Sequence, residues 1–194
     1  MLADTAITAE TFVYEPYRSM GGGTVTPTEP LYGLPGAEDT VEVSVDGDVT
    51  VTRRTAVMEF DGTEDWFVSS STTTGGLHWM ILAVANIAVP STLETISPRI
   101  CTHYVTKNGG DAWSSSTPCI STAYNDTYNG KSIRIYDVYS SVSAWNAYLA
   151  AQAAAGTPVT IVYELAAPET ETPADVDPIE PQIGEVNVFT DADS

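Results

Sequence analysis

The sequence predicts an all-β protein, an antiparallel and jelly-roll-like β-sandwich with one short α-helix near residues 143–155 and flexible N- and C-terminal arms. Short segments that alternate β-branched or aromatic residues with polar ones are separated by turn-forming residues, as in sandwich strands. One stretch alone is rich in strong helix formers. Both ends lack alternation and carry Gly, Pro or acidic residues. A chain of 194 residues is long enough to bury one sizeable core.

Three segments follow from this composition. Residues 1–30 form an N-terminal arm or linker, because Gly21-Gly22-Gly23 and the Pro/Thr-rich stretch after them favour extended backbone. Residues 31–167 form the β-sandwich domain. Residues 168–194 form an acidic, Pro-rich tail that buries too little apolar area to fold alone, with a short strand expected at 185–189.

The first clear element is a hairpin. Residues 41–45 and 49–52 both alternate Val with polar residues, and Asp46-Gly47 lies between them. Asp-Gly tolerates the positive φ angles of a two-residue type I′ turn, so these residues predict a tight hairpin.

Further strands follow along the chain, with loops expected at 70–76 and 107–118. Alternation or a continuous apolar run predicts them at Thr55–Phe60, Trp66–Ser69, Leu77–Val89, Arg99–Thr106 and Lys131–Tyr136.

The helix and the strand after it are well delimited. Residues 144–155 are nearly all helix formers, and either Ser141 or Ser143 can cap the helix N-terminus. Gly156 stands where a left-handed residue ends a helix, and Pro158 prevents the helix from resuming. Residues 159–165 then alternate as a strand.

The charge excludes some partners. The chain has 26 acidic and 7 basic residues, a formal net charge of −19, so nucleic acid and anionic membrane surfaces would repel it. The longest apolar run, Leu77–Pro90, is too short to span a bilayer, so we expect no membrane insertion. Residues 1–10 lack the basic and apolar regions of a signal peptide, which favours synthesis in a cytoplasm.

The sequence contains no recognisable catalytic or cofactor motif, so we expect no enzyme activity and no cofactor. The two histidines, His78 and His103, lie among strand-like residues and are expected to be structural. The cysteines, Cys101 and Cys119, form no CxxC pair and are expected to be free thiols, with a bridge between them as the alternative.

The acidic residues offer little more. The pairs Glu38-Asp39 and Glu64-Asp65 fall in predicted turns and are expected to be solvated surface, although a glycosidase-like carboxylate pair stays open. Asp46-Gly47-Asp48 resembles part of a calcium loop, but the hairpin turn explains it better, so no metal site is expected. Asn125-Asp126-Thr127 matches a glycosylation sequon that no secretion signal supports.

One aromatic residue is a candidate binding group. Trp113 falls in a polar loop, next to Ser114–Ser116, rather than in a predicted strand. An exposed indole ring can stack on a sugar, so Trp113 is the candidate glycan contact.

Three motifs together resemble a known family. They are Glu29-Pro-Leu-Tyr-Gly33 followed by Asp39–Val43; Val51-Thr-Arg-Arg54 followed by Phe60–Trp66; and the helix-Gly-Pro-strand segment Ala144–Glu171. Their order and spacing are similar to those of bacteriophage minor structural and tail-fibre-associated proteins, with a siphophage-like virion β-domain.

The resemblance implies a virion component, synthesised in the host cytoplasm, with a tail or receptor-binding role and no catalytic residues. We therefore expect a tail-fibre, tail-tip or head-fibre protein displayed on the particle, which contacts other virion proteins through the N-terminal arm or the acidic C-terminal tail. Analogy with fibres implies a homotrimer. The alternative is a carbohydrate-binding module for host-surface glycans, and a cell-wall hydrolase is a third hypothesis.

Overall fold

The computed structural model describes residues 32–43, 49–90, 92, 97–125 and 130–172. Its helices are α1 (Gly109–Trp113) and α2 (Val142–Ala154). Its strands are β1 (Gly33–Leu34), β2 (Ala37–Glu38), β3 (Thr40–Val43), β4 (Val49–Phe60), β5 (Phe67–Thr72), β6 (His78–Ala83), β7 (Arg99–Cys101), β8 (Val105–Thr106), β9 (Cys119–Asn125), β10 (Gly130–Asp137) and β11 (Val159–Glu171).

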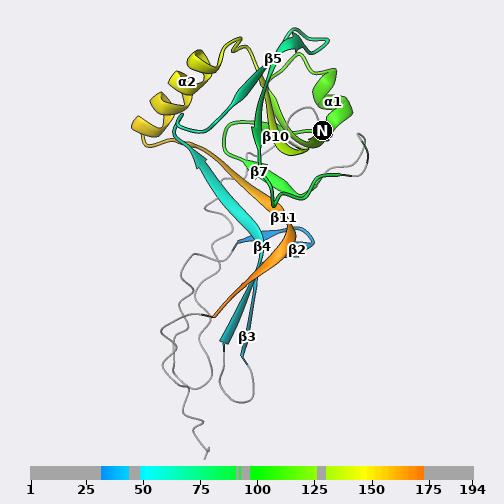
Figure 1. Cartoon of the computed structure of the whole chain (residues 1–194), viewed down its shortest axis with the longest axis vertical. Helices are drawn as coiled ribbons and strands as arrows, with labels where there is room; N and C mark the ends of the chain where they lie inside the picture. The colour runs from blue at the N-terminus through cyan, green and yellow to red at the C-terminus, as the bar shows by residue number, and fades with distance from the viewer. Residues whose placement is uncertain (1–31, 44–48, 91, 93–96, 126–129, 173–194) are drawn as a thin grey trace, which may run out of the picture.

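The strands form a sandwich-like body, which confirms the predicted all-β class. One sheet has the order β5-β6-β10-β9-β8 and a second has the order β3-β4-β11-β7, while β1 and β2 form a small hairpin. Every pairing is antiparallel except β8 with β9. In Figure 1 the two helices lie on opposite sides of the upper body, and β3 with the first half of β4 extends away below it.

The main core lies between the two larger sheets. Met80, Ile120 and Ile135 from the five-stranded sheet belong to one cluster with Phe60 and Ile161 from the four-stranded sheet. The β1–β2 hairpin covers the other side of β11, where Leu34 and Ala37 contact Val162. Successive residues of β11 therefore face two apolar layers, which is why this strand is buried on both faces.

The α2 helix closes one side of the core and follows the sequence prediction closely. Ser141 is the N-cap, and its side chain accepts a hydrogen bond from the backbone N–H of Ala144 at 3.3 Å. At the other end Gly156 has φ +76°, its N–H binds the Ala153 carbonyl, and the Thr157 N–H binds the Gln152 carbonyl. This is a Schellman ending, for which glycine is the favoured residue.

Two long strands join the body to an extended ribbon, which consists of β3, the first half of β4 and the end of β11. β4 and β11 pair from Val159↔Phe60 to Glu171↔Val51, with residues 165–168 of β11 bulging opposite Arg54. The bulge is held by Asn86, whose side-chain amide binds both the N–H and the carbonyl of Ala167. β11 thus runs past the domain boundary expected at residue 167, because a side chain replaces the missing backbone partners.

The β3–β4 pairing corrects the predicted hairpin. The two strands are antiparallel as expected, but Val43 pairs with Val49 and Val41 with Val51. A two-residue turn at Asp46-Gly47 would pair Val45 with Asp48, and so Val43 with Thr50. The register is therefore one residue away from the prediction, and the turn itself lies outside the described residues.

Two elements were not predicted. The expected loop 107–118 contains α1, whose N-cap Asn108 accepts a hydrogen bond from the Asp111 N–H at 2.7 Å. β9 carries small polar and apolar residues, and both of its faces are buried, so it shows no alternation. β5 also continues to Thr72, into the predicted loop 70–76.

Several predictions fall outside the described residues. They concern the N-terminal arm (1–30), the tail beyond residue 172 with its strand at 185–189, the calcium-like residues 46–48 and sequon residues 126–127. Among the residues that are described, no helix is both long and apolar enough to cross a membrane.

Candidate functional site

Trp113, the predicted glycan contact, lies at the last position of α1 and is 43% exposed. In Figure 1 this helix lies at one side of the upper body, away from β3. A capping interaction fixes the start of this short helix, since the Asn108 amide also donates to the Asp111 carboxylate at 3.0 Å. The structure thus presents a partly exposed indole ring on a defined turn of helix.

The Trp113 ring rests on a second tryptophan. Trp79 meets it edge to face, with 4.7 Å between ring centroids and 84° between planes. Trp79 in turn stacks on Tyr136 at 6.0 Å, and the Arg134 guanidinium carbon lies 5.6 Å from the Trp79 ring centroid. We call Trp79, Trp113, Arg134 and Tyr136 the tryptophan platform.

Hydrogen bonds between residues 73–77 and residues 113–115 hold Trp113 in place. The Thr73 hydroxyl donates to the Ser115 carbonyl at 3.0 Å and accepts from the Leu77 N–H, while the Thr74 N–H donates to the Trp113 carbonyl at 3.1 Å. Gly75 passes so close that a Cβ there would lie 2.3 Å from the Ser115 carbonyl oxygen. These contacts order Trp113 before any ligand arrives, which lowers the entropic cost of binding.

Trp113 is the exposed member of the platform, since Arg134 and Tyr136 are buried. An exposed indole face offers apolar and CH–π contact to a sugar or another flat ring. Across the described ranges there is no group of three His, Cys, Asp or Glu residues that could hold a metal ion.

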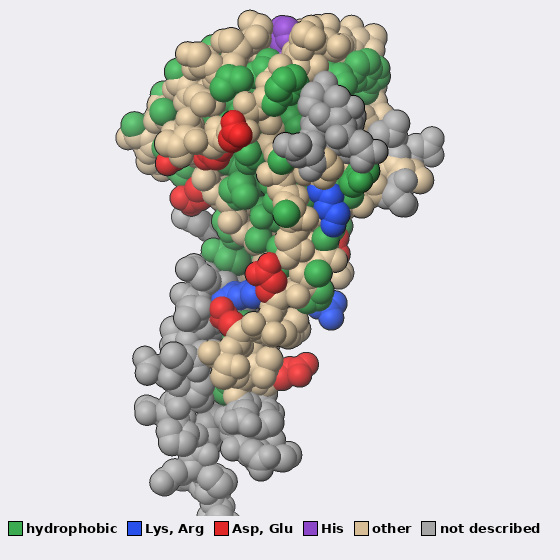
Figure 2. Space-filling model, in the orientation of Figure 1, with side chains coloured by type: hydrophobic (Ala, Val, Ile, Leu, Met, Phe, Trp, Pro, Cys, Tyr) green, Lys and Arg blue, Asp and Glu red, His purple; other side chains and the backbone are tan. Residues whose placement is uncertain are grey.

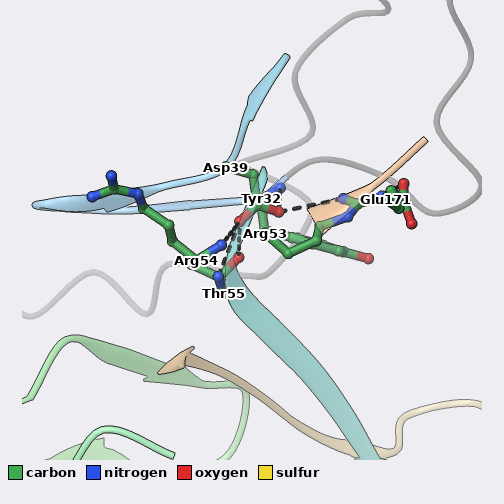
Figure 3. A network of polar contacts seen from close by, with 6 residues as sticks. All are labelled: Tyr32, Asp39, Arg53, Arg54, Thr55 and Glu171. Atoms are coloured by element: carbon green, nitrogen blue, oxygen red, sulfur yellow. Dashed lines mark hydrogen bonds and ion pairs between the residues drawn. The ribbon is translucent and has the colours of Figure 1, made fainter. Parts of the chain in front are cut away.

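The structure contradicts one expectation about the acidic pairs, because Asp39 is buried rather than solvated. Its side chain is 0% exposed, and Figure 3 shows it at the centre of a polar network between the body and the ribbon. Its two oxygens accept from the side chains of Arg53 and Thr55 and from the backbone N–H groups of Tyr32, Arg54 and Thr55. Arg53 also pairs with Glu171 at 2.9 Å.

This network is structural rather than a ligand site. Hydrogen bonds from its neighbours surround the Asp39 carboxylate, so it has little remaining capacity for a ligand. It ties β2, β4 and β11 together where β11 bulges. The one local signal for this network is Arg53-Arg54, and the partner of these arginines depends on the fold.

Glu64 is also more than solvated surface. It is half-buried, and its carboxylate accepts from the N–H groups of Asp61 and Gly62 and from the Trp66 indole. Trp66 then meets Trp145 of α2 edge to face at 5.4 Å. Glu64 therefore fixes the loop that carries Trp66 into the core, whereas its neighbour Asp65 is exposed as expected.

A buried tyrosine–carboxylate pair lies at the end of β10. The Tyr104 hydroxyl donates to Asp137 at 2.6 Å. Burial, followed by the hydrogen bond and the negative charge of Asp137, raises the pKa of Tyr104. Asp137 also accepts from the Val138 N–H at 2.7 Å, so the pair closes the strand end.

The histidines and cysteines behave as structural residues. His78 lies 3.4 Å from the Ser69 carbonyl, and His103 is exposed with a 2.7 Å contact to the Thr102 hydroxyl. Cys101 and Cys119 are free and buried, and burial raises the pKa of both thiols. A raised pKa keeps a thiol protonated and unreactive.

Comparison with known proteins identifies no relative. No family model, curated protein or solved structure matches the chain.

Proposed function

We propose that this protein is a structural component of a bacteriophage virion, a tail-fibre, tail-tip or head-fibre protein displayed on the particle. The proposal starts from the resemblance of three sequence motifs to phage virion proteins. The observation that carries it further is that these motifs, which are far apart in the chain, pack into one unit.

Their contacts are specific. Asp39 of the first motif binds Arg53 of the second, and Arg53 binds Glu171 of the third. Phe60 and Trp66 of the second motif meet edge to face at 5.1 Å, and Trp66 packs on Trp145 of the third. The motifs therefore form one shared frame, which comprises β3, β4, α2 and β11.

The rest of the body lies outside this frame. Residues 67–137 supply the whole five-stranded sheet and α1, and they carry the tryptophan platform. In this proposal the frame and its ribbon join the particle, and the five-stranded sheet faces outward. The net charge of −19 also suits a protein present in many copies on one surface, because it keeps the protein soluble.

The partners of the proposed virion protein are other virion proteins, joined through the N-terminal arm or the acidic C-terminal tail. A homotrimer is the proposed assembly, by analogy with fibres. Mass spectrometry of gradient-purified phage particles tests the virion assignment. We expect this chain to co-sediment with the infectious particles, and its absence from them would refute the proposal.

The second candidate function is binding of a host-surface glycan, favoured by the partly exposed and ordered ring of Trp113. A glycan array probed with the full chain tests it. We expect binding that Trp113→Ala abolishes and that Tyr124→Ala retains, since Tyr124 is exposed near the opposite end of β9. Equal binding by the Trp113 variant and the parent would remove this site.

A further inference from the structure

The outer side of α2 carries no charge. Residues 138–163 contain no Asp, Glu, Lys, Arg or His, although charged residues make up 17% of the chain. A helix on the surface of a globular protein normally presents charged and polar side chains to water. The exposed side of α2, at the outside of the upper body in Figure 1, instead consists mainly of alanines: Ala144, Ala147, Ala150, Ala151 and Ala154.

Two stacked tyrosines extend this neutral surface where the chain enters the helix. Tyr139 and Tyr148 are half-buried, and their ring centroids lie 5.1 Å apart with 28° between the ring planes. Ala144 and Ala151 share a face of α2 with Tyr148, because residues three and four apart in a helix are neighbours on its surface. We call Tyr139, Ala144, Tyr148 and Ala151 the α2 patch. Val138, which precedes Tyr139, is 67% exposed, the largest value among the large apolar side chains of the described residues.

The acidic loop between β4 and β5 borders a different side of this helix. A Cβ at Gly62 would lie 2.3 Å from the Asn146 carbonyl oxygen and 3.2 Å from the Ala150 backbone nitrogen. Asp61 and Asp65 are the exposed acidic residues of this loop. At 3.6 residues per turn, the side of α2 that this loop contacts is roughly 150° around the helix from the α2 patch. The patch therefore faces away from these carboxylates.

We propose that the α2 patch is a contact between copies of this chain, in which α2 of one copy packs against α2 of another. Charge favours a second copy as the occupant. Copies with a net charge of −19 repel each other where acidic residues meet, and an uncharged face lets them approach. A strongly basic partner would instead be drawn to the acidic surfaces.

The composition of the patch suits such a contact. Tyrosine is enriched and charged residues are depleted at the core of protein interfaces. Alanines allow two helix axes to approach closely, since the interaxial distance depends on the side chains at the contact. The stacked rings of Tyr139 and Tyr148 are already packed against the main core, so little ordering is required of them on association.

The contact is small, so the association is weak in solution. α2 has 13 residues and is therefore about 20 Å long. A single helix pair of this length buries less surface than a standard stable interface. The contact gains strength where copies are already held close together, because the effective concentration is then high.

This inference names a contact for the homotrimer of the proposed function, and in that respect it rests on the proposal. It is tested with the purified chain in solution, whereas the virion assignment is tested with purified particles. Either can therefore fail alone.

Sedimentation equilibrium of the full-length chain tests the contact. We expect a reversible monomer–oligomer equilibrium between about 10 µM and about 1 mM protein. We also expect tighter association at ~0.5 M salt than at ~0.05 M, because salt screens the repulsion between acidic copies while the patch itself has no ion pair to lose.

A charge placed in the patch should separate the copies. We expect Ala151→Glu to weaken the association about tenfold or more, since like charges then meet across the contact. Glutamate is a good helix former, so α2 keeps its structure, which circular dichroism checks. The matched control is Ala85→Glu, which adds the same charge at an exposed alanine on the turn after β6 and should leave the association unchanged.

Two results would overturn the proposal. One is a parent chain that stays monomeric over the whole concentration range at both salt concentrations. The other is an equal effect of Ala151→Glu and Ala85→Glu on the association, which would place the contact between copies elsewhere on the molecule.

Discussion

At the scale of single residues, Asp39 shows how a buried charge is made tolerable. Taking a carboxylate out of water is expensive unless donors surround it. Here the donors come from Tyr32, Arg53, Arg54 and Thr55, which lie on both sides of the junction between body and ribbon. The network therefore specifies how β2 meets β4 more than it adds net stability.

Removing this carboxylate should be costly. We expect Asp39→Ala to lower the free energy of unfolding by about 3 kcal/mol, because the Thr55 hydroxyl, several backbone N–H groups and Nη1 of Arg53 lose their carboxylate acceptor, while Glu171 still accepts from Nη2 of Arg53. Urea unfolding of the full chain measures this. The control is Glu59→Ala on β4, where the side chain is exposed and the expected change is within about 0.5 kcal/mol. Equal effects of the two substitutions would contradict the account of Asp39.

A second single residue, Tyr104, should make the stability of the folded chain depend on pH. Burial and the Asp137 carboxylate raise its pKa in the folded chain above the ordinary value of about 10. The folded state therefore keeps a proton that the unfolded state loses, so this contribution is complete below pH ~10 and declines as the pH rises further, by up to about 1.4 kcal/mol per pH unit.

Urea unfolding between pH 8 and pH 11 tests that sign. We expect the parent chain to be more stable than Tyr104→Phe at pH 8, and the difference to shrink above pH ~10. The comparison cancels the contribution of the two buried thiols, which both proteins share. A difference that stays constant or grows with pH would mean that Tyr104 is not held protonated.

At the scale of elements, the loop between β4 and β5 and the helix α2 are fitted to each other by a glycine. Gly62 has φ +87°, and a Cβ there would lie 2.3 Å from the Asn146 carbonyl oxygen. Gly36 has a similar φ of +82° with nothing within 4 Å. Comparison of the two glycines therefore separates the cost of a positive φ from the cost of close packing against α2.

Alanine substitution at the two glycines should therefore differ. We expect Gly36→Ala to cost about 1 kcal/mol from its left-handed backbone alone. Gly62→Ala should cost about 1–3 kcal/mol more, because the loop must move away from α2. Thermal unfolding of both variants measures the difference, and equal shifts in Tm would show that the approach to α2 is not tight.

The elements also show what the sequence can and cannot predict. α2 was predicted nearly to its ends, because Ser141 and Gly156 act locally. β9 was missed because burial on both faces removes alternation, and α1 was missed because Gly109-Gly110 outweighs the Asn108 cap in any propensity argument. The β3–β4 register differs by one residue from the one that a two-residue turn at Asp46-Gly47 would give.

The candidate site, too, could be predicted from the sequence only in part. Trp113 was identified from its polar surroundings, and it is indeed partly exposed. Its packing on Trp79, and the separation of Asp39 from solvent, depend on contacts between segments far apart in the chain. No local pattern carries that information.

At the scale of the whole molecule, the chain has a body and a ribbon at opposite ends (Figure 1). On the face in Figure 2 the top of the body shows apolar and neutral surface with a histidine, and charged side chains lie lower, toward the ribbon. This polarity suits a protein that is attached at one end and exposes a neutral, aromatic-bearing surface at the other. In the proposed virion protein the frame is the attached part and the five-stranded sheet is the displayed part.

The most direct test is a cryo-electron microscopy map of the purified phage particle. We expect density on the particle surface that fits the sandwich body, with the ribbon directed toward the particle and α1 directed outward. Particles that are complete and infectious but contain no such density, and no such protein by mass spectrometry, would contradict it.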